Sequence, residues 1–570
     1  MMNRLIILIA IACLPASILF AQQETWITNV NLVDPARKTI QPNMTVVVKN
    51  NLVTAIHRSK APGNVAVIDA AGKYLLPGLT DAHVHFFQSG GLYTRPDMID
   101  LRRIKPYSDE IKEIHAGLGD QLRRYIQNGI TTVFDVGATY HLLNHIKTFT
   151  GSNVTPEVHM AGPIITTGLI PTYDSLQDDT PFMLAATAED GRRLVQEQLK
   201  YHPDLIKLIF LLDDQPAVSH KPVVTAVIEE AHRHGLRVAV HAVGKERAQL
   251  AVEAGANFLV HSVENEEIDD AFVALLKKKK VVLCPTLTIE SGYQYTFDQS
   301  RKFTTHELIY AEPFALGSLY DLKQLPDTVL AQQYKLKSLA RAAPNAAKVN
   351  IRAKNLKKLS DAGVTIVSGS DAGNIGTLHA VSLLPELLEM QRSGMNTWQV
   401  LQAATIHPAA ILDRSGYTGN IGVGQPANMV LLNGDPVADL HQLEHIQLVV
   451  RNGHVIAPDT LIHQSPEALV QRQLNAYNSR NMEAFLNTYS DDAALYDFPG
   501  KLLRHGKEDL RKAYFFFDLA RLLHCRIDKR IVEGNFVIDK EHILDDHGTR
   551  GGTAIYQVEN GKIRKVFFIE

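Results

Sequence analysis

The middle of the chain, from Leu75 to about residue 412, alternates short apolar runs with longer amphipathic stretches. The apolar runs predict buried strands, and the amphipathic stretches, with their helical spacing, predict helices. Strands that alternate with helices are typical of a parallel sheet wrapped by helices. Eight strands are predicted: Leu76–His85, Thr131–Asp135, Val158–Gly162, Leu205–Ile209, Val238–Val243, Phe258–Val263, Val281–Leu287 and Thr365–Asp371.

The helices predicted between these strands are Glu110–Asn128, Ala188–Tyr201, Val223–His234, Lys245–Ala254, Ile268–Lys278 and Ala347–Ala362. Glycines follow four of the helices and precede strands, as C-cap glycines do: Gly129, Gly235, Gly255 and Gly363. This succession of strands and helices favours a (β/α)8 TIM barrel, an α/β fold. Such a barrel builds its active site at the C-terminal ends of its strands.

Short β patterns separated by turn signals flank this region on both sides. Those before it are Thr25–Leu32, Thr45–Lys49 and Leu52–Ile56, and those after it are Met429–Leu432, Ile446–Arg451 and His454–Ile456. The Asn452-Gly453 pair between the last two is a strong hairpin signal. We therefore expect residues 22–77 and 413–460 to form one small β-sandwich domain beside a barrel of residues 78–412.

A second change of pattern occurs near Ser465. A helix is predicted over Pro466–Ser479, and the chain then ends in β patterns with a further hairpin signal at Asn560-Gly561. Residues 464–570 are therefore predicted to form a separate α+β domain, an α+β cone at the C-terminus.

The segment Thr288–Pro344 departs from the alternation of strands and helices. It is long, rich in aromatic residues and marked by prolines. It follows the C-terminal end of a predicted strand, which is where a barrel places its active site. Two interpretations are open: a lid over the barrel mouth, or a helical excursion packed on the flank of the barrel.

The N-terminus has the plan of a secretory signal peptide. Arg4 is followed by an apolar run from Leu5 to Phe20 and then by Ala21, a small residue at the expected cut. We expect residues 1–21 to be removed after Ala21, which would make the protein periplasmic or secreted, with no stable membrane insertion. Two alternatives stay open. A retained anchor would be short and interrupted by Pro15, and a lipoprotein signal would use Cys13 as its lipid carrier.

The overall charge gives no sign of a nucleic-acid partner. The net charge is -3, whereas nucleic-acid-binding domains carry a strong basic footprint. The dense basic run Lys277–Lys280 ends a helical pattern, which indicates a solvated helix C-terminus. Cys284 and Cys525 are the cysteines outside the predicted signal, and because they fall in different predicted domains, we expect no disulfide.

Potential metal ligands stand at the ends of several predicted strands. His83 and His85 end the first strand, and residues two apart on a strand point to the same side. His241, His261 and Asp371 lie at the ends of the fifth, sixth and eighth strands. Because these ends gather at one face of a barrel, the histidines and the carboxylate predict a metal site there.

Lys207 is unusual because it lies inside an apolar strand, between Ile206 and Leu208. Burying a lysine is costly unless another interaction compensates for the lost hydration. The fourth strand is therefore predicted to contribute a functional group as well.

Four stretches resemble sequence motifs of the amidohydrolase superfamily: Leu76–His85, Val240–Gly244, Val260–Glu264 and Ser368–Gly373. The stretch Gly422–Val430 is similar to the return of that superfamily into its small β domain. The resemblance covers roughly residues 24–460. Lys207 and the helix end Ala231-His232, followed by Gly235, look like the imidazolonepropionase-related and prolidase-like dipeptidase branch.

The resemblance implies a binuclear centre with two divalent ions. The implied ligands are His83, His85 and Asp371 for one ion, and His241 and His261 for the other. Lys207 would be carboxylated by CO2, and its carbamate would bridge both ions. Such a donor set suits zinc. A hydroxide bridging the metals would attack the substrate carbonyl, with Asp371 as the general base that passes the proton to the leaving group.

The same resemblance implies hydrolysis of an amide (C–N) bond in a small molecule, such as a dipeptide or an N-acyl amino acid. A lactonase or esterase on the same centre is the alternative within enzymes, and a catalytically inactive binding protein is the alternative from another class. Tyr173 and His220 are candidate substrate-binding residues, although the loops that carry them depart from the family pattern. His379 is either a second layer of support for the site or a helix-surface residue.

Residues 464–570 resemble the SnoaL-like fold, which is also that of ketosteroid isomerases and nuclear transport factors. The stretches that carry the resemblance are Asn475–Asn478, Asp491–Gly500 and His505–Glu508. Asp497 falls where the isomerases keep a general base, but Gln473 occupies the position of their oxyanion tyrosine. We therefore expect a dimerising or ligand-holding module, through which the chain could form a homo-oligomer, in preference to a second enzyme.

The signal peptide leads to the first testable prediction. Mature protein recovered from the periplasm should begin near Gln22, because the small residue Ala21 precedes the expected cut. N-terminal sequencing or intact-mass spectrometry of the fractionated protein measures this directly. Soluble cytoplasmic protein that retains Met1 would contradict the prediction.

Overall fold

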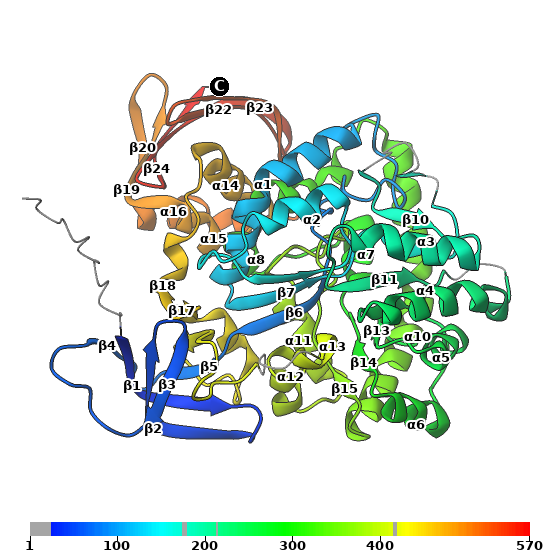
Figure 1. Cartoon of the computed structure of the whole chain (residues 1–570). Coiled ribbons are helices and arrows are strands. Elements are labelled where there is room, and N and C mark those ends of the chain that lie inside the picture. Colours follow the sequence, from blue (N-terminus) through cyan, green and yellow to red (C-terminus); the bar gives the residue numbers. More distant parts are fainter. Residues whose placement is uncertain (1–23, 171, 174–178, 212–214, 414–418, 570) are drawn as a thin grey trace, which may run out of the picture.

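The computed structural model describes residues 24–569, except 171, 174–178, 212–214 and 414–418. Figure 1 shows a β-sheet built from the N-terminal strands and the strands near residue 450, a central α/β part, and a β-rich C-terminal part. The predicted signal peptide, residues 1–21, lies outside the described residues. No helix in the described part is both long enough and apolar enough to cross a bilayer.

All eight strands predicted for the central part are present. They are β6 (Leu79–Val84), β7 (Ile130–Asp135), β8 (Glu157–Met160), β11 (Leu205–Ile209), β12 (Arg237–His241), β13 (Phe258–Val260), β14 (Val282–Cys284) and β15 (Thr365–Ile366). They pair in parallel with their neighbours. Most of their residues are buried, as is usual where helices cover the outside of a parallel sheet.

These strands form two parallel sheets that together resemble a TIM barrel. One sheet has the order β6-β7-β8, and the other has the order β10-β9-β11-β12-β13-β14-β15, with β9 (Ile164–Thr166) and β10 (Phe182–Leu184) as additional short strands. Single bridges connect the two sheets, from Ala161 to Leu205 and from Val84 to Ala372. The second of these bridges joins β6 to the segment that follows β15.

The helices around this sheet largely follow the prediction. They include α1 (Tyr107–Gln127), α3 (Ala188–Leu199), α4 (Lys221–Arg233), α5 (Lys245–Ala254) and α6 (Asp270–Lys279). The four C-cap glycines have φ angles of 72°, 72°, 110° and 77° in chain order, in the left-handed region that favours glycine. Helix α10 (Thr328–Asp361) is much longer than predicted and contains Pro344. Pro344 has no N–H to donate to the carbonyl oxygen of Ala340. Both residues are exposed, so water can bind that oxygen instead.

Strands from both flanks of the central part form one hydrogen-bonded sheet. Its strands are β1 (Glu24–Asp34), β2 (Thr39–Lys49), β3 (Leu52–His57), β4 (Ala66–Asp69), β5 (Tyr74–Pro77), β16 (Met429–Leu432), β17 (Ile446–Arg451) and β18 (His454–Ile456). The order is β18-β17-β16-β5-β1-β2-β3, with β4 beside β1. The antiparallel pair of β5 and β16 joins the N-terminal strands to those after the central part, as the sequence predicts.

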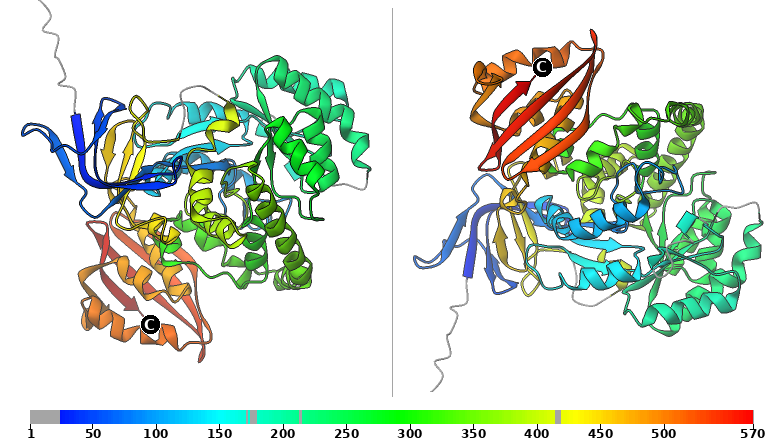
Figure 2. Two further views of the ribbon diagram at one scale, coloured as in Figure 1. Left: turned by 90° about the horizontal axis from the view of Figure 1, so that it is seen from below. Right: turned by 90° about the horizontal axis from the view of Figure 1, so that it is seen from above.

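The C-terminal part is a curved six-stranded sheet with helices on its concave side (Figures 1 and 2). Its strand order is β20-β19-β24-β23-β22-β21. The strands are β19 (Tyr489–Asp497), β20 (Lys501–His505), β21 (Leu523–Glu533), β22 (Phe536–Asp545), β23 (Gly548–Glu559) and β24 (Lys562–Ile569). Helices α14 (Pro466–Asn478), α15 (Met482–Asn487) and α16 (Lys507–Ala513) accompany them. We call this part the cone domain.

The aromatic segment after β14 has two roles in the structure. Its first helix, α7 (Ile289–Phe297), brings Tyr293 close to the barrel mouth, where its hydroxyl donates a hydrogen bond to Asn374 over 2.9 Å. The next helices, α8 (Thr305–Tyr310) and α9 (Pro313–Ser318), share one apolar cluster with the cone domain. The segment therefore both borders the mouth and packs on the flank.

The hairpin between β17 and β18 leads to a prediction about stability. Gly453 has a φ of 77°, and a Cβ added there would lie 2.0 Å from the carbonyl oxygen of Asn50. Gly453→Ala should therefore combine backbone strain, about 1 to 2 kcal/mol, with a steric clash that costs about 1 to 3 kcal/mol more. Thermal unfolding followed by calorimetry measures the loss.

Gly72→Ala is the matched control in the same sheet region. Gly72 has a similar φ of 74°, but a Cβ there has no neighbour within 4 Å. Gly72→Ala should therefore lose only the free energy of unfolding that backbone strain costs. An equal loss of stability in the two variants would contradict the proposed clash.

Candidate functional site

His83, His85 and Asp371 converge at the C-terminal end of β6. The Nε2 atoms of the two histidines lie 3.2 Å apart, and each lies 3.3 Å from Oδ1 of Asp371. All three side chains are buried, with relative exposures of 0%, 7% and 2% for the whole residues. The chain brings Asp371 here because its backbone N–H donates to the carbonyl oxygen of His83 over 2.8 Å.

His241, the last residue of β12, and His261, which directly follows β13, complete the cluster. The Nδ1 atom of His261 lies 3.9 Å from Oδ2 of Asp371 and 2.5 Å from Oγ1 of Thr286. The rings of His241 and His261 have centroids 4.3 Å apart. His261 and Asp371 both have positive φ angles, 74° and 53°. A positive φ angle strains the backbone of any residue other than glycine, and such strain is typical of functional sites.

Lys207 is the fourth strand's contribution to this group. It is 1% exposed, and burial lowers the pKa of its ammonium group to about 8. The negative charges of Asp371 and Asp135 act on the same group and oppose this shift. A lysine with this pKa is partly uncharged near neutral pH, so it can act as a nucleophile or be modified on nitrogen.

Three observations fit a divalent metal ion in this cluster. Ligand atoms of His83, His261 and Asp371 all lie within 4.8 Å of one another. Nδ1 of His85 donates to the carbonyl oxygen of Gly137 over 3.2 Å, which leaves its Nε2 lone pair facing the cluster. Burial lowers the pKa of His261 to about 3 and holds those of His83 and His241 well below the ordinary value.

The Nε2 lone pair of His85 and the carboxylate of Asp371 face each other across 3.3 Å. Such an arrangement is repulsive unless a cation or a proton lies between the atoms. The residues present therefore fit a metal ion, with nitrogen and oxygen donors that suit zinc and similar divalent ions.

Asp81 supports the cluster from within β6. Its carboxylate accepts hydrogen bonds from the backbone N–H and the hydroxyl of Ser370, over 2.9 and 2.5 Å. The backbone N–H of His83 is a weaker third donor at 3.4 Å. Burial raises the pKa of Asp81 to about 7. Asp81 thus ties the strand that carries two histidines to the segment that carries Asp371.

A polar network extends from Asp371 away from the histidines. Nδ2 of Asn374 donates to Oδ1 of Asp371 over 2.9 Å. Oδ1 of Asn374 accepts from the Tyr293 hydroxyl and from the guanidinium of Arg95. Arg95 also forms two hydrogen bonds with Asp97, of 2.8 and 2.6 Å. Arg95, Asp97 and Asn374 lie in loops, so no periodic pattern of the sequence predicts their roles.

The two residues expected to bind substrate occupy different environments. Tyr173 is 1% exposed, and its hydroxyl donates to Asp97 over 2.8 Å. Tyr173 therefore belongs to the network around Arg95, and Asp97 and Arg95 link it to Asn374. His220 ends a short helix, Ala217–His220, and its half-buried ring contacts Phe210 at a centroid distance of 5.9 Å.

His379 is buried and is not a helix-surface residue. Its ring stacks on Phe86, with centroids 5.2 Å apart and planes 6° from parallel. The hydroxyl of Tyr125 lies 2.7 Å from Nδ1, and Nε2 donates to the carbonyl oxygen of Gln88 over 2.8 Å. His379 therefore holds the loop that directly follows His85.

The cone domain has a separate cavity of about 620 Å³. The carboxyl group in its lining belongs to Glu541, which accepts a hydrogen bond of 2.9 Å from Tyr556. Burial raises the pKa of Glu541 to about 7. Gln473 lines the cavity and donates to the Tyr489 hydroxyl over 3.1 Å. Asp497, which the resemblance singled out, is not part of this lining.

A barrel-like parallel sheet with histidines and an aspartate at its C-terminal strand ends is suited to metal-assisted hydrolysis. The model of the amidohydrolase family matches residues 74–456, and that of the SnoaL-like domain matches residues 470–566. The chain therefore belongs to the amidohydrolase family and carries a SnoaL-like domain after the family region.

The similar proteins have low sequence identity to this chain. The chain is 21% identical to an imidazolonepropionase of Alkaliphilus metalliredigens over 464 residues, which cover 75% of this chain and 91% of that protein. It is 23% identical over 236 residues to an uncharacterized protein of Mycobacterium tuberculosis. That match covers 41% of this chain and about half, 52%, of the mycobacterial protein.

Solved structures share the fold at similarly low sequence identity. A Xaa-Pro dipeptidase with methionine in its active site is 22% identical, with a TM-score of 0.59 over 76% of this chain and 100% of that one. Molinate hydrolase is 19% identical, with a TM-score of 0.58 over 78% of this chain and 97% of that one. Identities this low establish a common fold and not a common substrate.

His379 leads to a prediction about pH. Burial lowers its pKa to about 4, whereas an unfolded histidine has a pKa near 6.5. The unfolded state therefore binds the proton more tightly, and the free energy of unfolding should fall as the pH is lowered from about 6.5 to about 4. The contribution of this one group is at most about 3 kcal/mol.

The test compares the pH dependence of chemical unfolding in wild type and in His379→Gln. The variant should lose stability less steeply between these pH values, whatever its absolute stability. His454→Gln, at an exposed position, controls for the substitution itself. Parallel curves for wild type and His379→Gln would refute the assignment.

Proposed function

We propose that this protein is a binuclear metal-dependent hydrolase that cleaves amide (C–N) bonds. The observation that carries the proposal is the convergence of His83, His85, His261 and Asp371 within a few ångströms, with Lys207 buried on β11. The family supports a hydrolase, and the cluster supports metal-assisted chemistry. The closed (β/α)8 form of the central part belongs to the same proposal.

The ligands would divide between two ions. His83, His85 and Asp371 would hold one ion, and His241 and His261 the other. Lys207 would bridge them as a carbamate. In that modification the uncharged Nζ attacks CO2, an N–C bond forms, and one N–H proton leaves to solvent. The lowered pKa of Lys207, about 8, favours the uncharged amine that this reaction needs.

When bound, zinc or a similar divalent ion would supply Lewis acidity, which polarises a carbonyl group and lowers the pKa of a water molecule. Asp371 would accept the proton of the attacking water and deliver it to the leaving nitrogen. Asn374 holds the carboxylate for this task by donating to Oδ1 of Asp371. The other oxygen, Oδ2, faces His261.

A dipeptide or an N-acyl amino acid is the substrate class that we propose. A Xaa-Pro dipeptidase and an imidazolonepropionase are among the similar proteins, and both names refer to substrates with a C–N bond next to a carbonyl group. Arg95 places a cation beside Asn374 at the mouth. Its charge is largely balanced by Asp97, so it would position a substrate by hydrogen bonds through its network.

We further propose that the cone domain is a supporting module and not the hydrolytic one. It shares an apolar cluster with α8 and α9 of the central part, whereas the whole predicted ligand set lies before residue 372. A homo-oligomer formed through this domain and a periplasmic or secreted location complete the proposal.

Lys207 provides the decisive variant. Lys207→Ala should lose bound metal and nearly all hydrolysis, because the bridging ligand is gone. Formate or acetate added to this variant should restore part of the activity by supplying an oxygen bridge. Metal content by mass spectrometry and turnover are measured together. Lys278→Ala, an exposed lysine on α6, is the matched control, and full metal occupancy in Lys207→Ala would exclude the carbamate.

A substrate panel tests the reaction class on the metal-loaded wild type. Prolyl dipeptides and N-acyl amino acids should be hydrolysed, and activity should disappear with a chelator and return with zinc. Turnover of lactones or esters alone would replace the amide assignment with the lactonase alternative. Full metal loading without turnover of any compound would instead favour a binding protein.

A further inference from the structure

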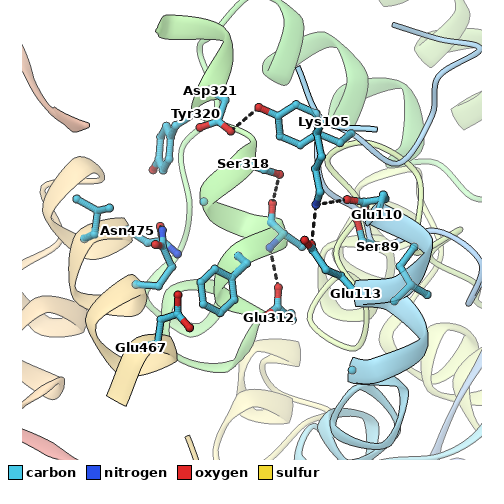
Figure 3. Close-up of a pocket in the computed structure, with 18 of the residues that line it drawn as sticks. Ser89, Lys105, Glu110, Glu113, Glu312, Ser318, Tyr320, Asp321, Glu467 and Asn475 are labelled. Atoms are coloured by element: carbon cyan, nitrogen blue, oxygen red, sulfur yellow. Dashed lines mark hydrogen bonds and ion pairs between the residues drawn. The ribbon is translucent and has the colours of Figure 1, made fainter. Parts of the chain in front are cut away.

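A cavity of about 750 Å³ lies between the central part and the cone domain (Figure 3). One wall comes from α1 and the loop after β6, and a second comes from the segment that contains α9. Helix α14 and the start of β21 close it from the cone domain. Its volume lies within the range of small-molecule sites. It is separate from the metal cluster, none of whose residues line it.

The lining is rich in carboxylates. It contains five of them, Glu110, Glu113, Glu312, Asp321 and Glu467, against one lysine and one arginine. The lysine, Lys105, is already bound by Glu110 and Glu113, over 2.6 Å in each case. The arginine, Arg526, pairs with Asp528 over 2.9 Å. The cations of the lining are therefore committed to other partners.

The remaining three carboxylates form no ion pair within 4.0 Å among the described residues, although the charges of Arg124 and Lys105 act on Glu312 and Asp321 from beyond that distance. Glu312 accepts the backbone N–H of Ala315 over 2.6 Å, as the N-cap of α9. Asp321 accepts from the Tyr93 hydroxyl over 2.8 Å. Burial raises the pKa values of Glu312 and Asp321. Figure 3 shows Glu312 and Glu467 on neighbouring elements at one side of the cavity.

Two buried polar atoms in the lining have no hydrogen-bond partner, and both are acceptors. Gln88 is 2% exposed, and its Oε1 is unsatisfied. His524 has Nε2 at 3.3 Å from Oε1 of Gln324, so that nitrogen carries the proton and the unpartnered Nδ1 is an acceptor. Unsatisfied buried acceptors are costly. They indicate a ligand that brings N–H donors.

Apolar surface adjoins these acceptors. Phe314 follows Glu312 directly and is 40% exposed, and it lines the cavity together with Leu474. An aliphatic chain would be buried by these two side chains while its charged end met the carboxylates. An anion would be repelled by the excess of carboxylates, and a neutral molecule would leave them unpaired.

We propose that this cavity binds a small organic amine, as an ammonium ion on an aliphatic chain, with Glu312, Glu467 and Gln88 as its main polar partners. The site also adjoins the hydrolytic centre. Gln88 lies three residues after His85, and its carbonyl oxygen accepts from His379, which stacks on Phe86. A ligand bound at Gln88 would therefore contact the loop that follows His83 and His85.

The experiment uses the metal-loaded full chain and calorimetric titration with n-pentylammonium chloride. 1-Pentanol and sodium pentanoate, which have the same carbon chain, are the neutral and anionic comparisons. We expect one ammonium ion bound per chain and no binding of the other two at the same concentrations. Equal binding of pentanol, or tighter binding of pentanoate, would overturn the proposal.

Glu312→Gln tests the position of the site. The amide oxygen can still cap α9, so the fold is kept, while the charge is lost and the dissociation constant should rise at least about tenfold. Glu467→Gln, at a partly exposed position, should weaken binding as well and serves if the first variant does not fold. Glu230→Gln, a buried carboxylate on α4 outside the lining, is the matched control.

An amine could also bind at the metal cluster, and Asp371→Asn separates the two sites. Binding that persists in Asp371→Asn and is weakened in Glu312→Gln supports the cavity. Binding that is lost in Asp371→Asn and unchanged in Glu312→Gln refutes it, and so does equal weakening in Glu230→Gln. These results do not depend on which bond the hydrolytic centre cleaves.

Discussion

The cluster of His83, His85 and Asp371 depends on how closely the end of β6 lies against the segment that follows β15. Backbone hydrogen bonds of 2.8 to 2.9 Å run in both directions between residues 82–85 and 368–372, and Asp81 adds its side chain to this contact. Gly369 makes the close approach possible, since a Cβ there would lie 2.7 Å from that of His83. Without this contact, Asp371 could not lie beside both histidines.

The framework of the site could be predicted because it follows from regular patterns. Apolar runs predict the eight strands and amphipathic spacing predicts the helices. Strand ends that carry histidines gather at one face in any parallel barrel. The spacing of His83 and His85 fixes their common direction once the strand is assigned. These are local properties of the sequence, and the contacts within the cluster agree with them.

The surroundings of the site could not be predicted in the same way. Arg95 and Asn374 meet across 279 positions of the chain, and both stand in loops without a periodic pattern. Tyr173 has a hydroxyl group that could serve a substrate, but the fold turns it toward Asp97. Glu541 is an acid in the middle of an amphipathic strand, and only the curvature of the sheet places it in a cavity. Such contacts depend on tertiary packing, which local sequence does not encode.

The pairing of β5 with β16 affects how the molecule unfolds. Pro77 lies opposite Met429, so the entry and exit of the whole central part are hydrogen-bonded neighbours. This strand pair acts as a non-covalent cross-link around a very long loop, and such closure lowers the conformational entropy of any state in which the pair persists. The two ends of the central part therefore stay side by side while the flanking sheet is intact. Loss of the sheet should therefore favour opening of the framework that holds the histidine cluster.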